Sequence, residues 1–424
     1  MRPGAVTAGA VHAAALLLTL AAFAATLRHG LADPGTALAF GLLVAAGTLT
    51  RTAPRPDPGP PAPYDREAAP LAAAAALGYA LLGDAATATS HGALQTVAVT
   101  VAAGLAGIVP HVARGRGPGR DHVARRILTV GFAALCAQPL HDSGVLLARL
   151  GPGAPYVLVL LLVLVLTALC DAVLAALLLR ARTSYPYGPL LREELRGLLG
   201  IGSAVCATGV VMALGVATAG LWTLPVLAVP VLLAQISLRR YAAVRTVGRQ
   251  TIASLARATE IAGCTPPGHA RRVAALATAV GRELGLGGTD LTVLEYAALM
   301  HDIGQLSLVD PVAGGATALL PAEEQRRIAL LGGEVVRMTG VPPAVALVVE
   351  RQADPYRDQP LAARIVRAVN AYDDLAGEDG AAALEALERL RLGTARDYHP
   401  QVVAGLARVL ARGGAPGVTS VPTG

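Results

Sequence analysis

Residues 197–238, "GLLGIGSAVCATGVVMALGVATAGLWTLPVLAVPVLLAQISL", form an uncharged stretch in the middle of the chain. The stretch is about twice as long as the roughly 20 apolar residues that one helix needs to cross a bilayer. We therefore expect two membrane helices that fold back near Ala219 and Gly220. Trp222 then lies at the outer interface, where aromatic residues are enriched.

Further apolar runs precede this stretch. The chain has 424 residues, of which 54% are hydrophobic, and its mean hydropathy of +0.54 is too high for a soluble protein of this length. Eight runs approach the length of a span, at about 5–27, 35–50, 68–83, 90–112, 127–148, 154–179, 197–218 and 221–238. We predict a polytopic helical membrane domain over residues 1–238 with about eight helices. Because the second and third runs are short, seven spans remain an alternative. We recognise no known family in this domain.

The distribution of arginine predicts how these helices are oriented. All 35 basic residues are arginine, and the formal net charge is +6. With the N-terminus inside, the expected inner loops hold Arg51, Arg55, Arg66, Arg114, Arg116, Arg120, Arg125, Arg126, Arg180, Arg182, Arg192 and Arg196. The expected outer loops hold only Arg28 and Arg149. Because basic residues stay on the cytoplasmic side, we expect a multi-pass protein with both termini cytoplasmic. We attribute the basic charge to contact with the lipid bilayer and expect no nucleic-acid partner.

Ionisable residues occur within two of the apolar runs. Asp171 interrupts "LVLVLTALCDAVLAALLL", and His141 and Asp142 follow Pro139 near the outer end of the fifth run. Charged groups at membrane depth are costly and often functional. Two interpretations stay open. Either Asp171 pairs with an arginine such as Arg180 or Arg182 near the inner interface and His141-Asp142 belong to a loop, or these residues sense a ligand or a proton.

The character of the sequence changes after the last span. Residues 239–264 predict a connecting helix that carries a signal out of the membrane, and its apolar stripe through Leu255 and Ala258 suggests a homodimer. From 265 to 411, charges are frequent and amphipathic segments alternate with breaks at Gly, Pro and Asp, which predicts an all-helical cytoplasmic domain. Residues 412–424 lack periodicity, and we expect this tail to be disordered. The predicted fold class is therefore all-α throughout.

A histidine and an aspartate stand next to each other in this cytoplasmic domain, in "LMHDIGQLSL" (299–308). His301 and Asp302 end one expected helix, and His269 lies in the first turn of an earlier one. Histidine nitrogen and aspartate oxygen both bind divalent zinc, manganese or iron. His269, His301 and Asp302 are therefore candidate metal ligands.

Four ordered motifs in residues 251–410 resemble the HD superfamily of metal-dependent phosphohydrolases, and within it the bacterial HD-GYP branch. They are "LARATEIAGCTPPGHARRVAALA", "LMHDIGQLSL", "ARIVRAVNAYDDLAG" and "GTARDYHPQVVAGL". The resemblance implies an all-α domain whose metal ions activate water against a phosphodiester or phosphomonoester. In this branch it also implies cyclic di-GMP as a substrate. His269 and His301 match family ligands, and Asp302 matches the aspartate that bridges two metals and would be catalytic in an active domain.

The sequence also departs from the family pattern. Gln305 replaces a lysine, and "RIALLGGEVV" (327–336) lacks the histidine ligand of the corresponding helix. Val348 and Val349 stand where the family has paired histidines, and Asn370 stands where it has the last aspartate ligand. Asp373 matches another recurrent family position that is not a ligand. The resemblance is therefore to a degenerate member that holds at most one divalent ion, with manganese, iron or zinc as candidates.

Three interpretations of this site stay open: polar residues joined only by hydrogen bonds, one bound ion without turnover, or a working phosphohydrolase. We expect a signalling protein in the bacterial cell (inner) membrane whose degenerate HD-GYP-like output domain has weak or no catalysis. A cyclic dinucleotide or a cytoplasmic signalling protein is its expected partner. The alternatives are an active cyclic di-GMP phosphodiesterase and a transporter with a regulatory HD domain.

Overall fold

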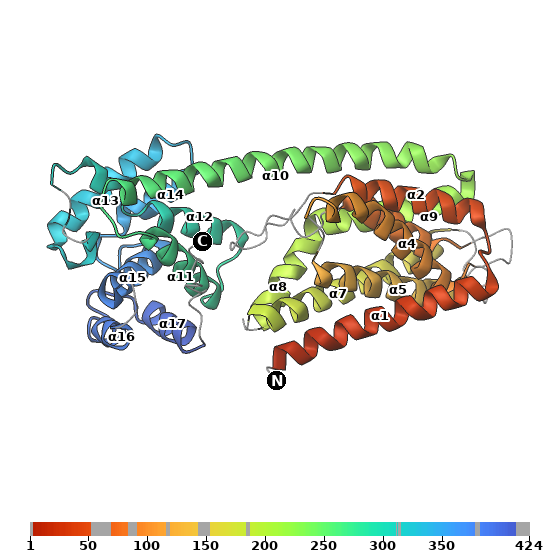
Figure 1. Ribbon diagram of the computed structural model, residues 1–424, viewed down its shortest axis with the longest axis horizontal. Coiled ribbons are helices and arrows are strands. Elements are labelled where there is room, and N and C mark those ends of the chain that lie inside the picture. The colour runs from red at the N-terminus through yellow and green to blue at the C-terminus, as the bar shows by residue number, and fades with distance from the viewer. Residues whose placement is uncertain are drawn as a thin grey trace. The chain divides into compact units, whose positions relative to one another are not determined.

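The computed structural model describes residues 3–51, 69–83, 91–115, 119–142, 153–183, 187–310, 312, 315–377 and 382–412. Within these ranges the fold is all-α and contains no strand, which confirms the predicted fold class. The chain divides into two compact units, one ending at Ala242 and the other beginning at Ala243 (Figure 1). The predicted disordered tail lies outside the described residues except for Arg412.

The first unit is built from apolar helices. They are α1 (Pro3–His29), α2 (Pro34–Leu49), α3 (Pro70–Leu81), α4 (Gly92–Val112), α5 (Arg120–Asp142), α7 (Ala154–Thr183), α9 (Ser203–Ala219) and the first part of α10 (Thr223–Ile261), with the amphipathic α8 (Tyr187–Gly197) and the π-helix η1 (Leu198–Gly202) before α9. Among the described residues, five helices are long and apolar enough to cross a membrane: α1, α4, α5, α7 and the start of α10. The shorter α2, α3 and α9 are also apolar. Each of the eight expected runs thus forms a helix, and α9 ends at Ala219 beside Gly220 (φ 80°), at the expected turn.

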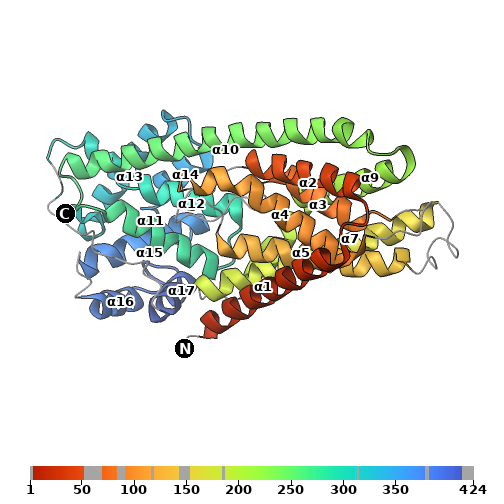
Figure 2. The ribbon, with the colours of Figure 1, turned by 45° about the vertical axis from the view of Figure 1, so that its right-hand side comes forward.

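The helices of the first unit approach one another closely through small residues. A Cβ atom on Gly47 of α2 would lie 2.4 Å from the backbone nitrogen of Ala72 in α3. One on Gly107 of α4 would lie 2.1 Å from the Thr48 hydroxyl of α2. Small residues let helix backbones meet in this way in membrane bundles, where van der Waals packing drives association. Figure 2 shows α1, α4 and α5 side by side, in agreement with their mutual contacts.

Helix α3 lies inside this bundle. All of its residues are buried. The amide of Gln235 in α10 caps its N-terminal end, because Gln235 Oε1 accepts from the backbone nitrogen of Leu71 at 3.0 Å. At the other end, Gln138 Nε2 of α5 donates to the carbonyls of Ala80 and Leu82 at 2.9 and 3.1 Å. The first unit therefore surrounds a short helix whose ends are satisfied by protein groups.

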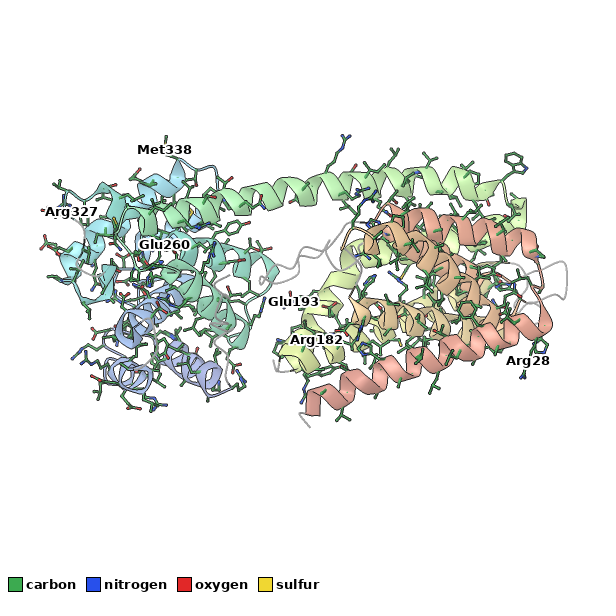
Figure 3. The ribbon with its side chains drawn as sticks, viewed as in Figure 1. Arg28, Arg182, Glu193, Glu260, Arg327 and Met338 are labelled. Carbon is green, nitrogen blue, oxygen red and sulfur yellow. The ribbon has the colours of Figure 1, made fainter. Side chains whose placement is uncertain are left out.

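Two acidic residues of the first unit, Asp121 and Asp171, form ion pairs. Asp171 pairs with Arg125 at 3.2 Å and accepts from the Thr129 hydroxyl at 3.0 Å. The pairing of Asp171 with an arginine agrees with the first of the two interpretations, although the partner is Arg125; Arg182 pairs with Asp121 instead. Arg28 and Arg182 lie at opposite ends of the unit (Figure 3). The side chains of His141 and Asp142 lie outside the described residues.

The second unit is a separate helical domain. It contains the end of α10, then α11 (His269–Glu283), α12 (Gly288–Met300), the 3₁₀ turns η2 (Ile303–Ser307) and η4 (Thr317–Leu319), α13 (Ala322–Arg337), α14 (Pro343–Arg351), α15 (Leu361–Ala376), α16 (Ala383–Leu392) and α17 (Pro400–Ala411). Helices α11, α12, α14 and α15 enclose one hydrophobic core. This core positions α11, α12 and α15, which carry the candidate ligands.

The expected eighth span and the expected connecting segment form one continuous helix, α10. Its last turns bury Ile252, Ala256 and Thr259 in the second unit. Leu255 packs at the edge of the core, and Ala258 is only partly buried. The buried face of α10 is therefore offset from the apolar stripe that the sequence suggested.

Candidate metal centre

Two helix ends bring the candidate ligands together. Helix α11 begins at His269, directly after Gly268, whose left-handed conformation (φ 76°) lets the chain turn sharply into the helix. Helix α12 ends at Met300, so His301 and Asp302 follow it immediately before the turn η2. His269, His301 and Asp302 are all buried, with exposed fractions of 1%, 1% and 4%.

The ligand atoms of these residues form a small triangle. His269 Nε2 and His301 Nε2 are 3.4 Å apart, and Asp302 Oδ2 lies 3.3 Å from the first and 3.1 Å from the second. Ligands that bind one zinc-like ion at about 2.1 Å, with angles near 90–110°, are themselves about 3.0–3.4 Å apart. The spacing therefore fits a single divalent ion.

Both imidazole rings are held so that their Nε2 atoms face the centre of the triangle. His269 Nδ1 donates to Asp373 Oδ2 at 2.8 Å, and His301 Nδ1 donates to the carbonyl of Ala298 at 2.8 Å. A neutral imidazole with its proton on Nδ1 has a lone pair on Nε2. With the proton of each ring on Nδ1, both Nε2 lone pairs could bind one cation beside the carboxylate of Asp302.

Asn370 of α15 supplies a fourth donor atom, an amide oxygen. Its Oδ1 lies 3.0 Å from His301 Nε2, while its Nδ2 donates to the Thr317 hydroxyl at 3.1 Å. That hydroxyl in turn donates to Asp302 Oδ1 at 3.2 Å. The position that resembles the last family ligand therefore lies beside the triangle, but it offers a neutral amide oxygen.

The electrostatics of the cluster also favour a bound cation. Burial lowers the pKa of His269, but the carboxylates of Asp302 and Asp373 outweigh burial and raise this pKa to about 10. Burial raises the pKa of Asp302, and the two imidazoles outweigh it, so that its pKa lies below the usual range. The buried carboxylates therefore stabilise a proton on the imidazole of His269. A divalent ion would replace that proton as the positive charge of the cluster.

Residues 268–375 match the family model of the HD domain. The match begins one residue before His269 and includes every residue of the cluster. It supports assignment of this region to the HD superfamily, whose domains usually bind divalent metals. No curated protein and no solved structure matches the chain.

The HD domain carries two acidic residues near the cluster whose contacts the sequence did not reveal. Asp373 binds Arg272 as well as His269, with 2.9 Å between Arg272 Nη2 and Asp373 Oδ2. Asp374 lies 4.0 Å from His269 Nδ1 and accepts from the backbone nitrogen of Ala318 at 3.1 Å. Burial raises the pKa of Asp374 to about 6. The only sequence signal for Asp374 is its place directly after Asp373.

Apart from Asn370, the positions where the sequence departs from the family pattern offer no further ligands among the described residues. Val348 and Val349 of α14 are part of the hydrophobic core of the HD domain. Gln305 is buried, and its Nε2 faces the carbonyl of Gly315 at 3.5 Å. Helix α13 packs directly against η2, because Gly332 and Gly304 leave no space between their backbones. Aliphatic side chains and close backbone packing therefore stand where further ligands would be needed.

The contact between Asp373 and His269 leads to a prediction. Asp373→Ala removes the acceptor that holds the Nδ1 proton, so the His269 ring is no longer fixed with its lone pair toward the cluster. We expect metal affinity to fall about 10- to 100-fold, as is usual when the outer partner of a ligating histidine is lost. Chelator competition on the full-length protein measures this. Asp354→Ala, an acidic residue paired with Arg326, is the control, and equal affinities in the two variants would refute the role of Asp373.

Proposed function

We propose that the protein is a membrane-bound signalling protein whose HD domain binds one divalent ion and has little or no hydrolytic activity. The HD domain suggests a phosphohydrolase type of metal chemistry. The observation that carries the proposal is the buried triangle of His269, His301 and Asp302, completed by the amide of Asn370 and not by a carboxylate. When bound, the ion would act as a Lewis acid toward a phosphate oxygen or a water molecule.

The donor set supports one ion and not two. Paired metal ions in hydrolases lie about 3.5–4 Å apart and share several carboxylates and imidazoles. In this HD domain, two imidazoles and one carboxylate converge on one point, while Val348 and Val349 contribute only aliphatic surface. The nearby carboxylates of Asp373 and Asp374 are already bound by Arg272 and by the backbone of Ala318, so a second divalent cation would find few ligands among the described residues.

The surroundings of the triangle argue against rapid turnover. Thr317 is buried and hydrogen-bonds to both Asp302 and Asn370. Ala318 is tied to Asp374, and Gln325 Nε2 donates to the carbonyl of Ala318 at 3.1 Å. The segment around η4 is thus hydrogen-bonded to the cluster, and a phosphodiester that approaches the ion from this side would have to break these bonds.

The signalling role rests on the arrangement of the chain. Helix α10 begins as an apolar segment and ends in the core of the HD domain without interruption, so a change in one part of this helix can reach the other. We propose an output through binding of a cyclic dinucleotide or a cytoplasmic signalling protein, in a homodimer at the bacterial inner membrane. The HD-GYP relationship is part of this proposal and is supported by the four sequence motifs.

A direct test measures metal content and hydrolysis in the same sample of full-length protein. We expect about one manganese, iron or zinc ion per chain and hydrolysis of cyclic di-GMP at background. An active cyclic di-GMP phosphodiesterase is the second candidate, because the histidines and the aspartate of the triangle are present. Hydrolysis above background that Asp302→Ala abolishes would establish that candidate, and a protein without bound metal would refute both.

The amide at position 370 gives a more specific expectation. Asn370→Asp places a carboxylate oxygen near His301 Nε2, and a negative oxygen is the better ligand for a hard divalent cation. We expect metal affinity to increase about tenfold, a change of about 1.4 kcal/mol, while hydrolysis stays at background. Asn370→Leu is the matched variant and should weaken binding. If the aspartate variant binds no more tightly than the native protein, Asn370 does not contact the ion.

A further inference from the structure

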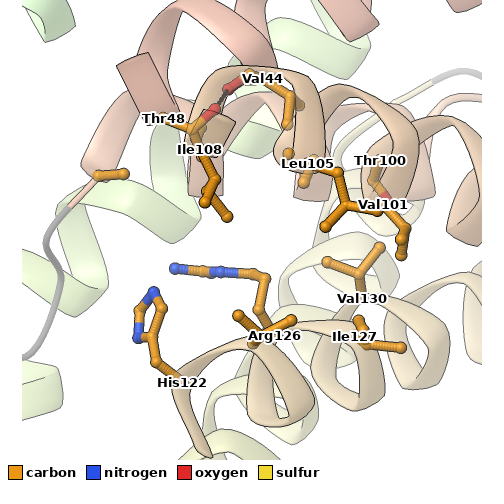
Figure 4. Close-up of a pocket in the computed structure, with 15 residues that line it drawn as sticks. Val44, Thr48, Thr100, Val101, Leu105, Ile108, His122, Arg126, Ile127 and Val130 are labelled. Carbon is orange, nitrogen blue, oxygen red and sulfur yellow. Dashed lines mark hydrogen bonds between the residues drawn. The ribbon is translucent and has the colours of Figure 1, made fainter. Parts of the chain in front are cut away.

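The first unit contains a small cavity of about 80 Å³ (Figure 4). Mostly aliphatic side chains of α2, α3, α4 and α5 enclose it. The hydroxyls of Thr48 and Thr100 in its wall donate to carbonyls of their own helices, at 2.6 and 2.8 Å. A space of this size accommodates only a few water-sized molecules. Contacts with a closer link to chemistry lie in the HD domain, next to the metal centre.

One peptide group joins two of the three ligands in the metal centre. His301 and Asp302 are adjacent, and the carbonyl of His301 belongs to the planar peptide between them. A rotation of this plane would change the directions in which both side chains leave the backbone. The distance of 3.1 Å between His301 Nε2 and Asp302 Oδ2 therefore depends on the orientation of this peptide group.

A glutamine from another helix end holds this peptide group. Gln352 directly follows α14, and its Nε2 donates to the carbonyl of His301 at 2.8 Å. The last carbonyls of a helix have no partner within the helix, and α12 ends at Met300. The Gln352 amide thus binds the main chain of His301, while the ring of His301 is held separately through Nδ1 and the carbonyl of Ala298.

Gln352 is itself fixed by two other side chains. Gln359, which is only 2% exposed, donates from Nε2 to the backbone carbonyls of Gln352 and Asp354, both at 2.7 Å. Arg367 of α15 donates from Nη1 to the same carbonyl of Asp354 at 3.0 Å. The side chain of Asp354 takes no part in these bonds. Because Arg367 precedes Asn370 by about one turn, α15 carries both the fourth donor and an anchor of the segment that holds Gln352.

We propose that Gln352 is a positioning residue of the metal centre, which fixes the peptide group between His301 and Asp302 so that both side chains meet one ion. Gln352 acts on the main chain and is not itself a ligand. Ligands need to be held within about 0.5 Å of their binding geometry, and hydrogen bonds from outer partners hold them there. This inference rests on the proposed binding of a divalent ion.

Gln352→Met tests the proposal, because methionine has nearly the length of glutamine but cannot donate this hydrogen bond. We expect the affinity of the full-length protein for zinc to fall about tenfold, the lower end of the range for losing an outer partner. Chelator competition measures the affinity. Thr339→Val is the matched control, because it removes a bond of 2.7 Å to the carbonyl of Val336 at the end of α13. The control should bind zinc as the native protein does.

Cobalt separates positioning from a general loss of stability. The visible spectrum of bound cobalt reports the geometry of its ligands. We expect Gln352→Met to change this spectrum and Thr339→Val to leave it unchanged, even where both variants lower the Tm of the metal-free protein equally. Native zinc affinity together with a native cobalt spectrum in Gln352→Met would overturn the proposal.

The same measurements distinguish the role of Gln352 from the proposed function. If the native protein binds neither zinc nor cobalt, both are wrong, whereas equal binding by the native protein and Gln352→Met refutes only the role of Gln352. If Gln352→Met does not fold, Arg367→Met takes its place, since it loosens the segment that holds Gln352 but keeps the Gln352 amide. Zinc affinity should then fall about threefold, because the lost bond is farther from the ligands, and native affinity would refute the proposal.

Discussion

Gly304→Ala is expected to destabilise the HD domain by about 3 kcal/mol or more, the upper range for overpacking a tight core. A Cβ atom at this position would lie 2.1 Å from the carbonyl oxygen of Ile328 and 2.7 Å from the backbone nitrogen of Gly332. Both atoms belong to the backbone of α13, so no side-chain rotation can relieve the clash. Either α13 or the turn η2 must move, and η2 directly follows Asp302.

Hydrogen exchange of the full-length protein, followed in peptides from α12 and α13, measures this loss of stability. Gly288→Ala is the matched control, because a Cβ on Gly288 at the start of α12 meets no atom within 4 Å. The control should exchange as the native protein does. Similar protection in both variants would mean that α13 does not pack on η2 as closely as described.

His301→Ala should remove bound metal from the HD domain. The substitution removes one of the two imidazole ligands. It also removes the contacts that His301 Nε2 makes with Asp302 and Asn370. We expect the metal content to fall from about one ion per chain to nearly none, because losing a ligand costs more than the ~10–100-fold that follows the loss of an outer partner. Elemental analysis of full-length protein after removal of free metal gives the number directly.

The matched control for this experiment is His399→Ala. His399 precedes α17 in the same HD domain and forms an edge contact with Tyr356, outside the cluster. It should keep the native metal content. A native content in His301→Ala would show that the ion, if present, is bound elsewhere.

Periodicity and span length account for most of the fold. The eight apolar runs form helices because an apolar segment must satisfy its backbone hydrogen bonds internally wherever water is excluded, and five of the described helices are long enough to cross a membrane. The turn near Gly220 was predictable because an uncharged stretch of double length cannot form one span. In the HD domain, His301 and Asp302 were recognisable because they are adjacent and end an apolar helix.

The remaining features depend on contacts between distant parts of the chain. Thr317 closes over the cluster from a turn with no recognisable motif, and Asp374 approaches His269 only through the packing of α15 on α11. Arg125 and not Arg182 pairs with Asp171, because the α5–α7 interface decides which arginine is near. Local sequence patterns carry no information about such pairings, since they depend on how helices pack.

The complete burial of α3 has a consequence for how the first unit matches the bilayer. At 1.5 Å per residue, this helix of 12 residues spans about 18 Å, against a hydrocarbon thickness of about 30 Å. A lipid-exposed helix of that length would have to thin the bilayer locally, at a cost that grows with each ångström of mismatch. Because the surrounding helices bury α3 and the amides of Gln235 and Gln138 bind its backbone ends, its length would be free of this constraint in a bilayer. Hydrophobic matching would then depend on the longer helices around α3.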